Sequence, residues 1–475
     1  MDLFSTARLS KGALNSSDHR TEFERDYDRI LFSAPVRRLV DKTQVFPQEK
    51  NDSVRNRLTH SHEVSNLARS LAMRLGRQPN LAFDGLFDGA QVAVIAAAAG
   101  LAHDVGNPPF GHQGEKAISR WFEKNELDIC GEGVSLPEQQ RLDLLHWEGN
   151  AQAFRLVTRL QVSKGNTGLN LTAATLAALM KYTVASHERD GGPGAHSAKK
   201  KFGYFWADRQ AANWVFDQTG ISGGLRHPIA YIMEAADDIA YSVIDIEDAV
   251  TKRLVSIHDV RAAIGSTAPE SMLGLLDGHI KDLATEARAP DEISDIVAQY
   301  FRTFAIDHLM CAASDTYTKH KAEIQSGRFG SGLIEASDAA EFCKTLKRFA
   351  FENAFSHDHV REVELQGEIM LHKLADRLWR GIDECSLRSS KLSQIEAAQG
   401  LMPKEQTTFG EFVYGQISKN YRDAFERDIS LATSPAEIRY RQILLLTDML
   451  SGMTERYSTD LLKKLDRVHD GQIPA

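Results

Sequence analysis

The amino-acid sequence predicts an all-α protein built around a buried helical core. Apolar residues recur at helical spacing along most of the chain, whereas no succession of alternating strands and no repeat of fixed period is found. The run from Val92 to Ala102 carries no charge and no side chain larger than Leu or Ile, so its helix should be apolar all round. We therefore expect this helix to lie inside the protein.

The expected helices follow one another along the whole chain. We place them at about residues 58–75, 89–104, 172–186, 228–253, 281–305, 339–354, 363–380 and 436–465. Gly76 closes the first of them, Gly106 stops the second, and Pro228 is a favoured first-turn residue of the fourth. Two weak stretches, 189–203 and 388–408, are surface loops or junctions between lobes.

Composition argues against several functional classes. The chain has 475 residues, of which 42% are hydrophobic and 25% charged, an ordinary globular composition. Its four cysteines lack CxxC spacing and its start lacks the pattern of a secretory signal, so we expect a reduced, cytoplasmic protein. The longest uncharged apolar run is well short of the about 20 residues that cross a bilayer, so no membrane role is expected. A net charge of −9 argues against a protein with an extensive basic surface for nucleic acid, although Lys199–Lys201 could bind phosphate locally.

An adjacent imidazole and carboxylate, His103 and Asp104, end the apolar helix. Burying an ionised carboxylate without compensation costs several kcal/mol, and a divalent cation is one of the few partners that neutralise it. Gly106, Pro108 and Pro109 then stop the helix and leave this pair at the mouth of a turn. His103 and Asp104 therefore indicate half of a metal site.

A further imidazole, His60, begins the apolar stripe that runs to Leu75 on the first predicted helix. His62 lies about 200° further round the same helix and should point away from the core. A lone histidine on an apolar face is more often a satisfied core residue than a ligand. His60 becomes a candidate ligand if His103 and Asp104 meet it.

The fourth ligand should be a carboxylate from the helix at 228–253, since the sequence has no HxxxH or HExxH pair. Asp237 interrupts an apolar row of that helix, whereas Asp238 lies on its polar side, and most acidic residues there should be surface charges. Tyr241 and Asp245 extend from Asp237 along one side at i+4 and i+8. On periodicity alone, a solvated acidic helix face explains the pattern equally well.

Together these residues resemble a known family. His60, the pair His103–Asp104 and Asp237 resemble the H…HD…D signature of the HD superfamily of metal-dependent phosphohydrolases. Within it, five segments are similar to the deoxyguanosine triphosphate triphosphohydrolases: Arg37–Pro47, Arg57–Val64, His103–His112 with Gly114 and Glu115, Glu234–Tyr241 and Ser451–Thr454. The likeness covers most of residues 20–253 and a short piece around 448–457. One departure is Thr183, which follows Lys181–Tyr182 where the family continues with Pro-Trp.

The resemblance implies an HD-domain helical core with an additional helical C-terminal region. Residues 1–253 would form an N-terminal arm and the catalytic core, and residues 254–475 would complete the nucleotide pocket and the oligomer interface. The implied reaction converts a deoxynucleoside triphosphate, with dGTP favoured, to the deoxynucleoside and inorganic triphosphate. Two rivals remain: another HD-type nucleotide phosphohydrolase or phosphodiesterase, and a non-catalytic sensor of dNTP or single-stranded DNA.

The resemblance also assigns roles to individual residues. His112 would act as general acid or base, with Glu115 as the carboxylate that orients it. By the same resemblance, Arg57 and Lys181 would bind phosphates, and Gln44, Tyr241 and Asp245 would select deoxyribose.

Further expectations concern the cofactor and the partners. One divalent metal per subunit is expected, with manganese favoured over Fe²⁺, Co²⁺, Zn²⁺ and Mg²⁺. The implied assembly is a hexamer in which a neighbour's C-terminal segment, with Arg439 or Arg441, helps to recognise the base. A second dNTP or single-stranded DNA is a candidate effector, and the sequence leaves base preference open.

Overall fold

The structure is a computed structural model that describes residues 2–10, 19–45, 54–78, 89–131, 134–161, 167–286, 288–355, 358–385 and 407–469. Over these ranges the chain is helical and forms no strands, apart from two isolated antiparallel bridges, Arg8–Thr172 and Thr43–Asn56. The predicted all-α class is therefore confirmed. No described helix is both long enough and apolar enough to cross a membrane.

The helices before residue 254 are α1 (Glu22–Leu31), α2 (Ala34–Arg38), α3 (Arg57–Gly76), α4 (Gly89–Ala102), α5 (Gly111–Cys130), α6 (Glu138–Leu145), α7 (Gly149–Arg155), α8 (Ala173–Leu179), α9 (Arg209–Thr219) and α10 (Pro228–Thr251). Those that follow are α11 (Ile257–Ala263), α12 (Glu270–Thr285), α13 (Pro290–Lys319), α14 (Lys321–Gln325), α15 (Ala340–Ala350), α16 (Asp358–Cys385), α18 (Thr408–Gln416), α19 (Lys419–Ile429), α20 (Pro435–Gly452) and α21 (Glu455–His469). Short helical turns lie at η1 (Leu39–Asp41), η2 (Leu156–Leu160), η3 (Ser186–Glu188), η4 (Ser197–Lys199), η5 (Trp206–Asp208) and η6 (Phe351–Phe355).

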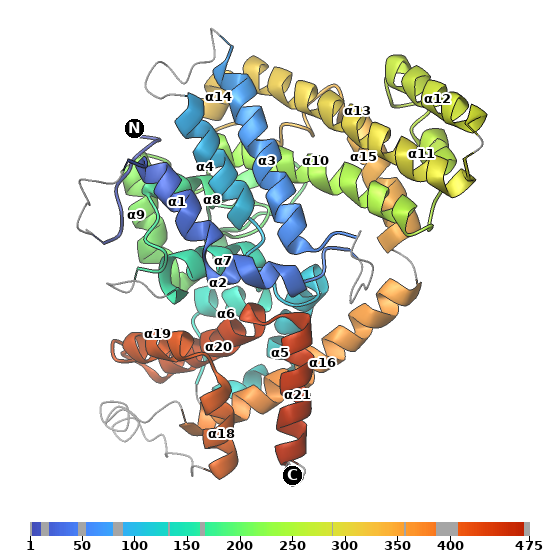
Figure 1. The fold of residues 1–475 in the computed structure, drawn as a ribbon. Coiled ribbons are helices and arrows are strands. Elements are labelled where there is room, and N and C mark those ends of the chain that lie inside the picture. The colour runs from blue at the N-terminus through green and yellow to red at the C-terminus, as the bar shows by residue number, and fades with distance from the viewer. Residues whose placement is uncertain are drawn as a thin grey trace.

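The uncharged helix α4 lies in the upper half of the molecule as drawn in Figure 1 and packs against α1, α3, α8 and α10. Every residue from Ile95 to Ala102 is buried, as its composition predicts. Gly100 permits the close approach of α3, because a Cβ at this position would lie only 2.9 Å from the Cα of Ser65. This contact brings the C-terminal end of α4 beside the N-terminal half of α3.

The helix α10 packs against α3, α4, α13 and α15 and so joins the earlier helices to later ones. It begins with Pro228, and the His227 side chain caps its N-terminus by accepting the Ile229 N–H. The α11–α12 segment extends from the body at one corner, whereas α18 to α21 gather with α5 and α16 at the opposite end (Figure 1). A second apolar core fills that end, with α16 and α20 contacting α5.

Three predicted helices have different bounds in the structure. The stretch 281–305 spans a break, because α12 ends at Thr285 and Pro290 starts α13, and proline cannot continue a helix. The stretch 436–465 divides at Met453, whose backbone is extended between α20 and α21. Within the stretch 172–186, the helix α8 ends at Leu179. The turn that follows places the Lys181 carbonyl oxygen where it accepts a hydrogen bond from Nε of Arg226.

The remaining predicted helices correspond to α3, α4, α10, α15 and α16, with α15 continuing into η6. The stretch 189–203 contains only the short turn η4, in agreement with the predicted loop. The other weak stretch, 388–408, lies almost wholly outside the described residues.

Candidate active site

Three helices bring the four predicted ligands together. His60 comes from α3, His103 and Asp104 from the turn after α4, and Asp237 from α10. The His60 Nε2 atom lies 3.3 Å from Oδ1 of Asp237, and the His103 Nε2 atom lies 3.5 Å from the same oxygen. His103 Nε2 is also 3.5 Å from Oδ1 of Asp104. Ligand atoms of His60, His103 and Asp104 all lie within 4.8 Å of one another, a spacing that one metal ion can bridge.

The imidazoles of this cluster are held in place by their surroundings. His103 Nδ1 lies 2.7 Å from the Gly100 carbonyl oxygen, so it carries the proton and leaves Nε2 free to act as a ligand. His60 is only 2% exposed, and its ring meets that of His103 edge-on at 5.4 Å between centroids. His62 is exposed on the other side of α3, as predicted.

Both carboxylates are held in the ionised form. Burial raises the pKa of Asp237, but the facing His103 and the hydrogen bond from His60 outweigh it and hold that pKa well below its usual range. Burial likewise opposes ionisation of Asp104, yet the positive charge of Arg57, with His103 beside it, lowers its pKa to about 2. A metal requires deprotonated carboxylates, and these two satisfy that condition at neutral pH.

The two predicted phosphate-binding cations lie at the edge of the cluster. Arg57 Nη1 donates to Oδ2 of Asp104 at 2.5 Å. Lys181 Nζ lies 3.9 Å from Oδ2 of Asp237 and 3.5 Å from Glu234. Burial lowers the pKa of Lys181, but neighbouring Tyr182 and the two carboxylates raise it overall, so the ammonium stays charged. Two cations thus remain next to the candidate metal ligands.

His112 and Glu115 form the predicted pair. His112 Nδ1 lies 2.8 Å from Oε2 of Glu115, while the His112 side chain remains 74% exposed and open to a ligand. Glu115 is buried and accepts the Gly149 N–H at 2.9 Å. The hydrogen bond and the charge of Glu115 raise the pKa of His112. An imidazole held in this way is suited to proton transfer near neutral pH.

Glycine is required directly before His112. Gly111 has a left-handed backbone with φ of 53°, and a Cβ there would lie 2.5 Å from Nη2 of Arg57. The start of α5 therefore passes directly beside the Arg57 guanidinium, which itself contacts Asp104.

The three residues assigned to the sugar include two with unpaired buried atoms. Among the described residues, no hydrogen-bond partner is found for Oε1 of Gln44 or for Oδ2 of Asp245. Buried polar atoms are rarely left unpaired unless a ligand or water reaches them. Tyr241, which is 36% exposed, lies between Asp237 and Asp245 along α10. Asp245 thus offers a hydrogen-bond acceptor one helical turn from an accessible aromatic ring on α10.

The expectation that most acidic residues of α10 lie on the surface is wrong. Asp245, Glu247 and Asp248 are buried. Arg55 neutralises two of them, pairing with Glu247 at 2.6 Å and with Asp248 at 2.5 Å. Arg302 of α13 also pairs with Glu247. The sequence shows these charges but not the arginines that face them.

Sequence reasoning also missed Asn107, and it named Lys201 only as part of a lysine run. Asn107 Nδ2 donates to Oδ1 of Asp104 at 2.6 Å, and its position three residues after Asp104 in the predicted turn was the available signal. Lys201 Nζ lies 2.8 Å from Glu148 and 3.9 Å from Glu115, at the end of the lysine run singled out in the sequence.

The arginines suggested for base recognition pair within their own chain. Arg439 donates to Asp383 at 2.6 Å, and Arg441 to Asp428 at 3.1 Å. Neither contact involves the metal-ligand cluster.

Two imidazoles and two carboxylates converging from three helices define an HD-type site, and the sequence profile of the HD domain matches residues 57–147. That match contains His60, His103, Asp104 and the His112–Glu115 pair, whereas Asp237 lies beyond it. The protein is therefore an HD-domain hydrolase.

Comparison with whole proteins specifies the family. The chain is 34% identical to a deoxyguanosinetriphosphate triphosphohydrolase-like protein of Listeria monocytogenes, with 95% of each chain covered. It is 35% identical to a probable deoxyguanosinetriphosphate triphosphohydrolase of Pseudomonas aeruginosa (94% and 92% covered) and 32% identical to a deoxyguanosinetriphosphate triphosphohydrolase of Serratia proteamaculans (94% and 93%). The chain belongs to the deoxyguanosinetriphosphate triphosphohydrolase family.

Proposed function

We propose that this hydrolase converts deoxynucleoside triphosphates, dGTP in the first place, to the deoxynucleoside and inorganic triphosphate. The observation that carries the proposal is the convergence of His60, His103, Asp104 and Asp237 with the cations Arg57 and Lys181. The His112–Glu115 pair and the unpaired oxygens of Gln44 and Asp245 support it further. The names of the relatives above support the same substrate class.

The ligand set fits a divalent metal, because it combines two imidazole nitrogens with two ionised carboxylates. Such a cation would supply positive charge for the α-phosphate and lower the pKa of a water. We favour Mn²⁺ over Fe²⁺, Co²⁺ and Zn²⁺, and Mg²⁺ tolerates imidazole ligands least. The hydrogen bond from His103 to the Gly100 carbonyl and that from Asn107 to Asp104 would hold two ligands in orientation.

Proton delivery falls to His112. Hydrolysis forms a bond from the water oxygen to the α-phosphorus and breaks the bond to the 5′ oxygen, which then requires a proton. Because the hydrogen bond and charge of Glu115 raise the pKa of His112, the protonated imidazole is favoured and can give its proton to that oxygen. The remaining phosphates would pair with Arg57 and Lys181.

Selection of deoxyribose would rest on Gln44, Tyr241 and Asp245. The unpaired oxygens of Gln44 and Asp245 can accept a hydrogen bond from the 3′ hydroxyl. The Tyr241 ring, packed against C2′, would leave neither space nor a hydrogen-bond partner for a ribose hydroxyl. Ribonucleotides would therefore be excluded by shape.

Product chromatography after incubation with each dNTP and with all four together tests the proposal. The manganese-loaded protein should release deoxynucleoside and triphosphate. Release of phosphate or pyrophosphate would favour another HD-type phosphohydrolase, and binding of dGTP without hydrolysis would favour a sensor. Stimulation in the mixture would indicate a dNTP effector, and parallel assays with single-stranded DNA would test the other candidate.

We also propose the division of labour expected from the family resemblance. Residues 1–253 would provide the arm and catalytic core, and residues 254–475 would complete the nucleotide pocket and an interface within a hexamer. Size measurement in solution tests the assembly.

A further inference from the structure

A buried carboxylate far from the metal ligands in sequence binds two active-site segments at once. Glu455, the first residue of α21, is only 5% exposed. Its Oε1 accepts the Thr43 N–H at 2.9 Å and the Phe110 N–H at 3.2 Å. Its Oε2 accepts the Thr43 hydroxyl at 2.6 Å. One side chain of the C-terminal region therefore joins two separate segments of the catalytic half.

Each of these segments leads directly into a residue of the proposed reaction. Thr43 immediately precedes Gln44, and Phe110 is separated from His112 only by Gly111. Thr43 also bridges to Asn56, the cap of the helix that carries His60. Displacement of Glu455 would therefore shift the proton donor and the sugar contact together.

The backbone at Phe110 needs such a contact. Phe110 has a left-handed backbone with φ of 63°, which non-glycine residues seldom adopt, and it is the residue before α5. Its side chain gives α5 no capping hydrogen bond. Such conformations persist where surrounding structure fixes them, and they cluster at functional sites. Glu455 supplies the hydrogen bond that fixes the Phe110 amide.

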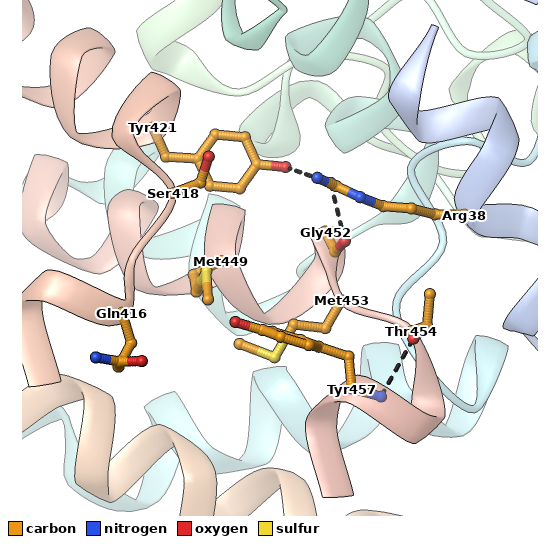
Figure 2. A pocket seen from close by; sticks show the side chains of 9 residues that line it. All are labelled: Arg38, Gln416, Ser418, Tyr421, Met449, Gly452, Met453, Thr454 and Tyr457. Atoms are coloured by element: carbon orange, nitrogen blue, oxygen red, sulfur yellow. Dashed lines mark hydrogen bonds between the residues drawn. The ribbon is translucent and has the colours of Figure 1, made fainter. Parts of the chain in front are cut away.

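Glu455 is itself held by a rigid turn between α20 and α21. Lys42 is buried and donates to the carbonyl oxygens of Ser451, at 2.8 Å, and Asn107, at 2.6 Å. Figure 2 shows the Arg38 guanidinium directed at the Gly452 carbonyl, to which it donates at 3.1 Å. Two basic side chains thus hold the end of α20, beside a pocket of about 410 Å³.

We propose that Glu455 is a positioning residue, which holds His112 and Gln44 in their working geometry through the amides of Phe110 and Thr43. The role rests on the proposed function, since it is defined by the reaction that His112 serves. Within the described residues, the side-chain hydrogen bonds of Glu455 go to Thr43 and Phe110 and not to the metal ligands, so its effect is transmitted through the backbone.

The test compares Glu455→Ala with Glu455→Gln. Alanine removes all three acceptor contacts, and a displacement of about 1 Å at a catalytic group can cost about 10²-fold in rate. Glutamine can keep its carbonyl oxygen at the Oε1 position, where both amides donate, and turn its amide toward the Thr43 hydroxyl, which can accept. We expect kcat for dGTP to fall about 10²-fold in the alanine variant and to stay within a few-fold of wild type in the glutamine variant. Metal content should be unchanged in both.

The matched control is Asp460→Asn, an exposed carboxylate on the same helix, which should leave kcat unchanged. A double-mutant cycle then separates positioning from general damage: in the His112→Ala background, Glu455→Ala should cost little further kcat, and the effect that passes through Gln44 should appear in KM. A full additional loss in that background would overturn the proposal, as would a folded Glu455→Ala variant with wild-type kcat.

Each remaining outcome has one interpretation. If Glu455→Ala does not fold, Glu455→Asp replaces it, because the shorter carboxylate withdraws from both amides, and wild-type kcat in that variant would overturn the proposal. A wild-type protein that hydrolyses none of the nucleotides would contradict the proposed function and this role with it. Active wild-type protein with fully active Glu455 variants would contradict this role alone.

Discussion

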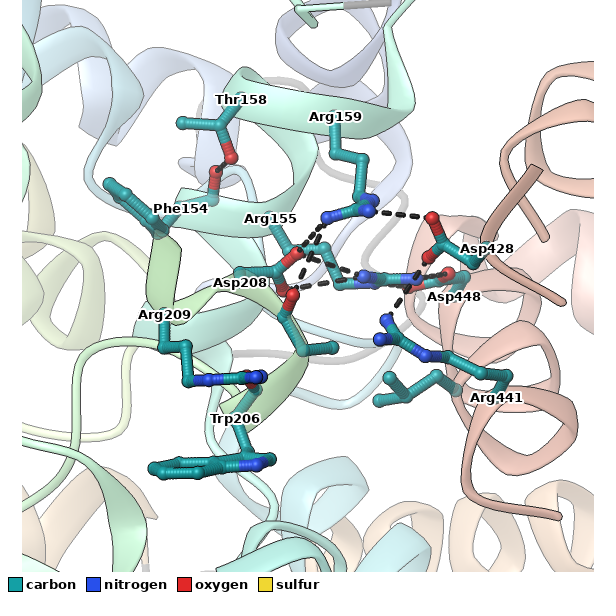
Figure 3. Close-up of polar contacts among 12 residues, drawn as sticks. Phe154, Arg155, Thr158, Arg159, Trp206, Asp208, Arg209, Asp428, Arg441 and Asp448 are labelled. Carbon is teal, nitrogen blue, oxygen red and sulfur yellow. Dashed lines mark hydrogen bonds and ion pairs between the residues drawn. The ribbon is translucent and has the colours of Figure 1, made fainter. Parts of the chain in front are cut away.

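Replacing Arg155 with methionine should destabilise the junction between the catalytic core and the C-terminal helices. Figure 3 shows the Arg155 guanidinium between Asp448 of α20 and Asp208 of η5. Two of its nitrogens donate to Asp448 at 2.8 Å each, and a third donates to Asp208 at 3.1 Å. Both carboxylates are 1% exposed. The variant therefore leaves two buried carboxylates without their shared cation.

The expected loss in the free energy of unfolding depends on the hydrogen bonds that the two carboxylates retain. Removing one partner of a buried ion pair costs about 3–5 kcal/mol. Asp448 retains a hydrogen bond from Gln152 at 2.9 Å, and Asp208 retains Arg159 at 3.1 Å. These remaining partners place the expected loss at the lower end, about 3 kcal/mol. The difference from wild type should shrink as the pH is lowered, because a protonated Asp448 no longer needs the cation.

Urea unfolding followed by tryptophan fluorescence measures this loss. The matched control is Arg209→Met, because Arg209 lies nearby, stacks on Trp206 at 4.6 Å and donates to a carbonyl rather than to a carboxylate. The control should cost about 1 kcal/mol or less. If Arg155→Met unfolds at the same urea concentration as Arg209→Met, the assignment of Arg155 as the central cation of this junction is wrong.

Three predictions concern the reaction. Glu115→Gln removes the charge that raises the pKa of His112. Because a general acid is active only below its pKa, the alkaline limb of the kcat–pH profile should move to lower pH. An unmoved limb would show that His112 is not the titrating acid. Tyr241→Ala should weaken discrimination between dGTP and GTP by about 10–100-fold in kcat/KM, measured for both substrates, whereas unchanged discrimination would assign ribose exclusion elsewhere. His112→Ala should retain its metal and lose about 10²–10⁴-fold in kcat, whereas Asp104→Ala should lose both metal and activity. Equal metal loss in the two variants would refute the assignment of proton transfer to His112 and metal binding to Asp104.

Local patterns in the sequence predicted which helix is buried and which side chains of the helices face the metal-ligand cluster. The uncharged run before His103 indicated the buried helix α4 because a helix without a polar face has no side to turn toward water. The apolar stripe after His60 fixed the inward face of α3, and with it the outward direction of His62. Periodicity left Asp237 undecided, and its candidacy strengthened only when the family signature was considered. The structure then placed its carboxylate within 3.5 Å of both imidazoles.

Pairings between distant segments could not be predicted in this way. A single sequence shows that Asp248 is charged, but only the fold brings Arg55, which is 193 positions away, to neutralise it in the core. Glu455 shows the same difficulty, since its role depends on contacts to Thr43 and Phe110 across more than 300 residues. Helix breaks that depend on tertiary contacts, such as the end of α8 before Lys181, were missed for the same reason.

The central claim is that His60, His103, Asp104 and Asp237 hold one divalent ion. Metal content per subunit, measured by mass spectrometry after dialysis of manganese-loaded protein, tests it directly when wild type is compared with His103→Ala and with His62→Ala, the outward-facing histidine of α3. We expect one equivalent in wild type and in His62→Ala and almost none in His103→Ala. Equal metal content in all three proteins would contradict the claim.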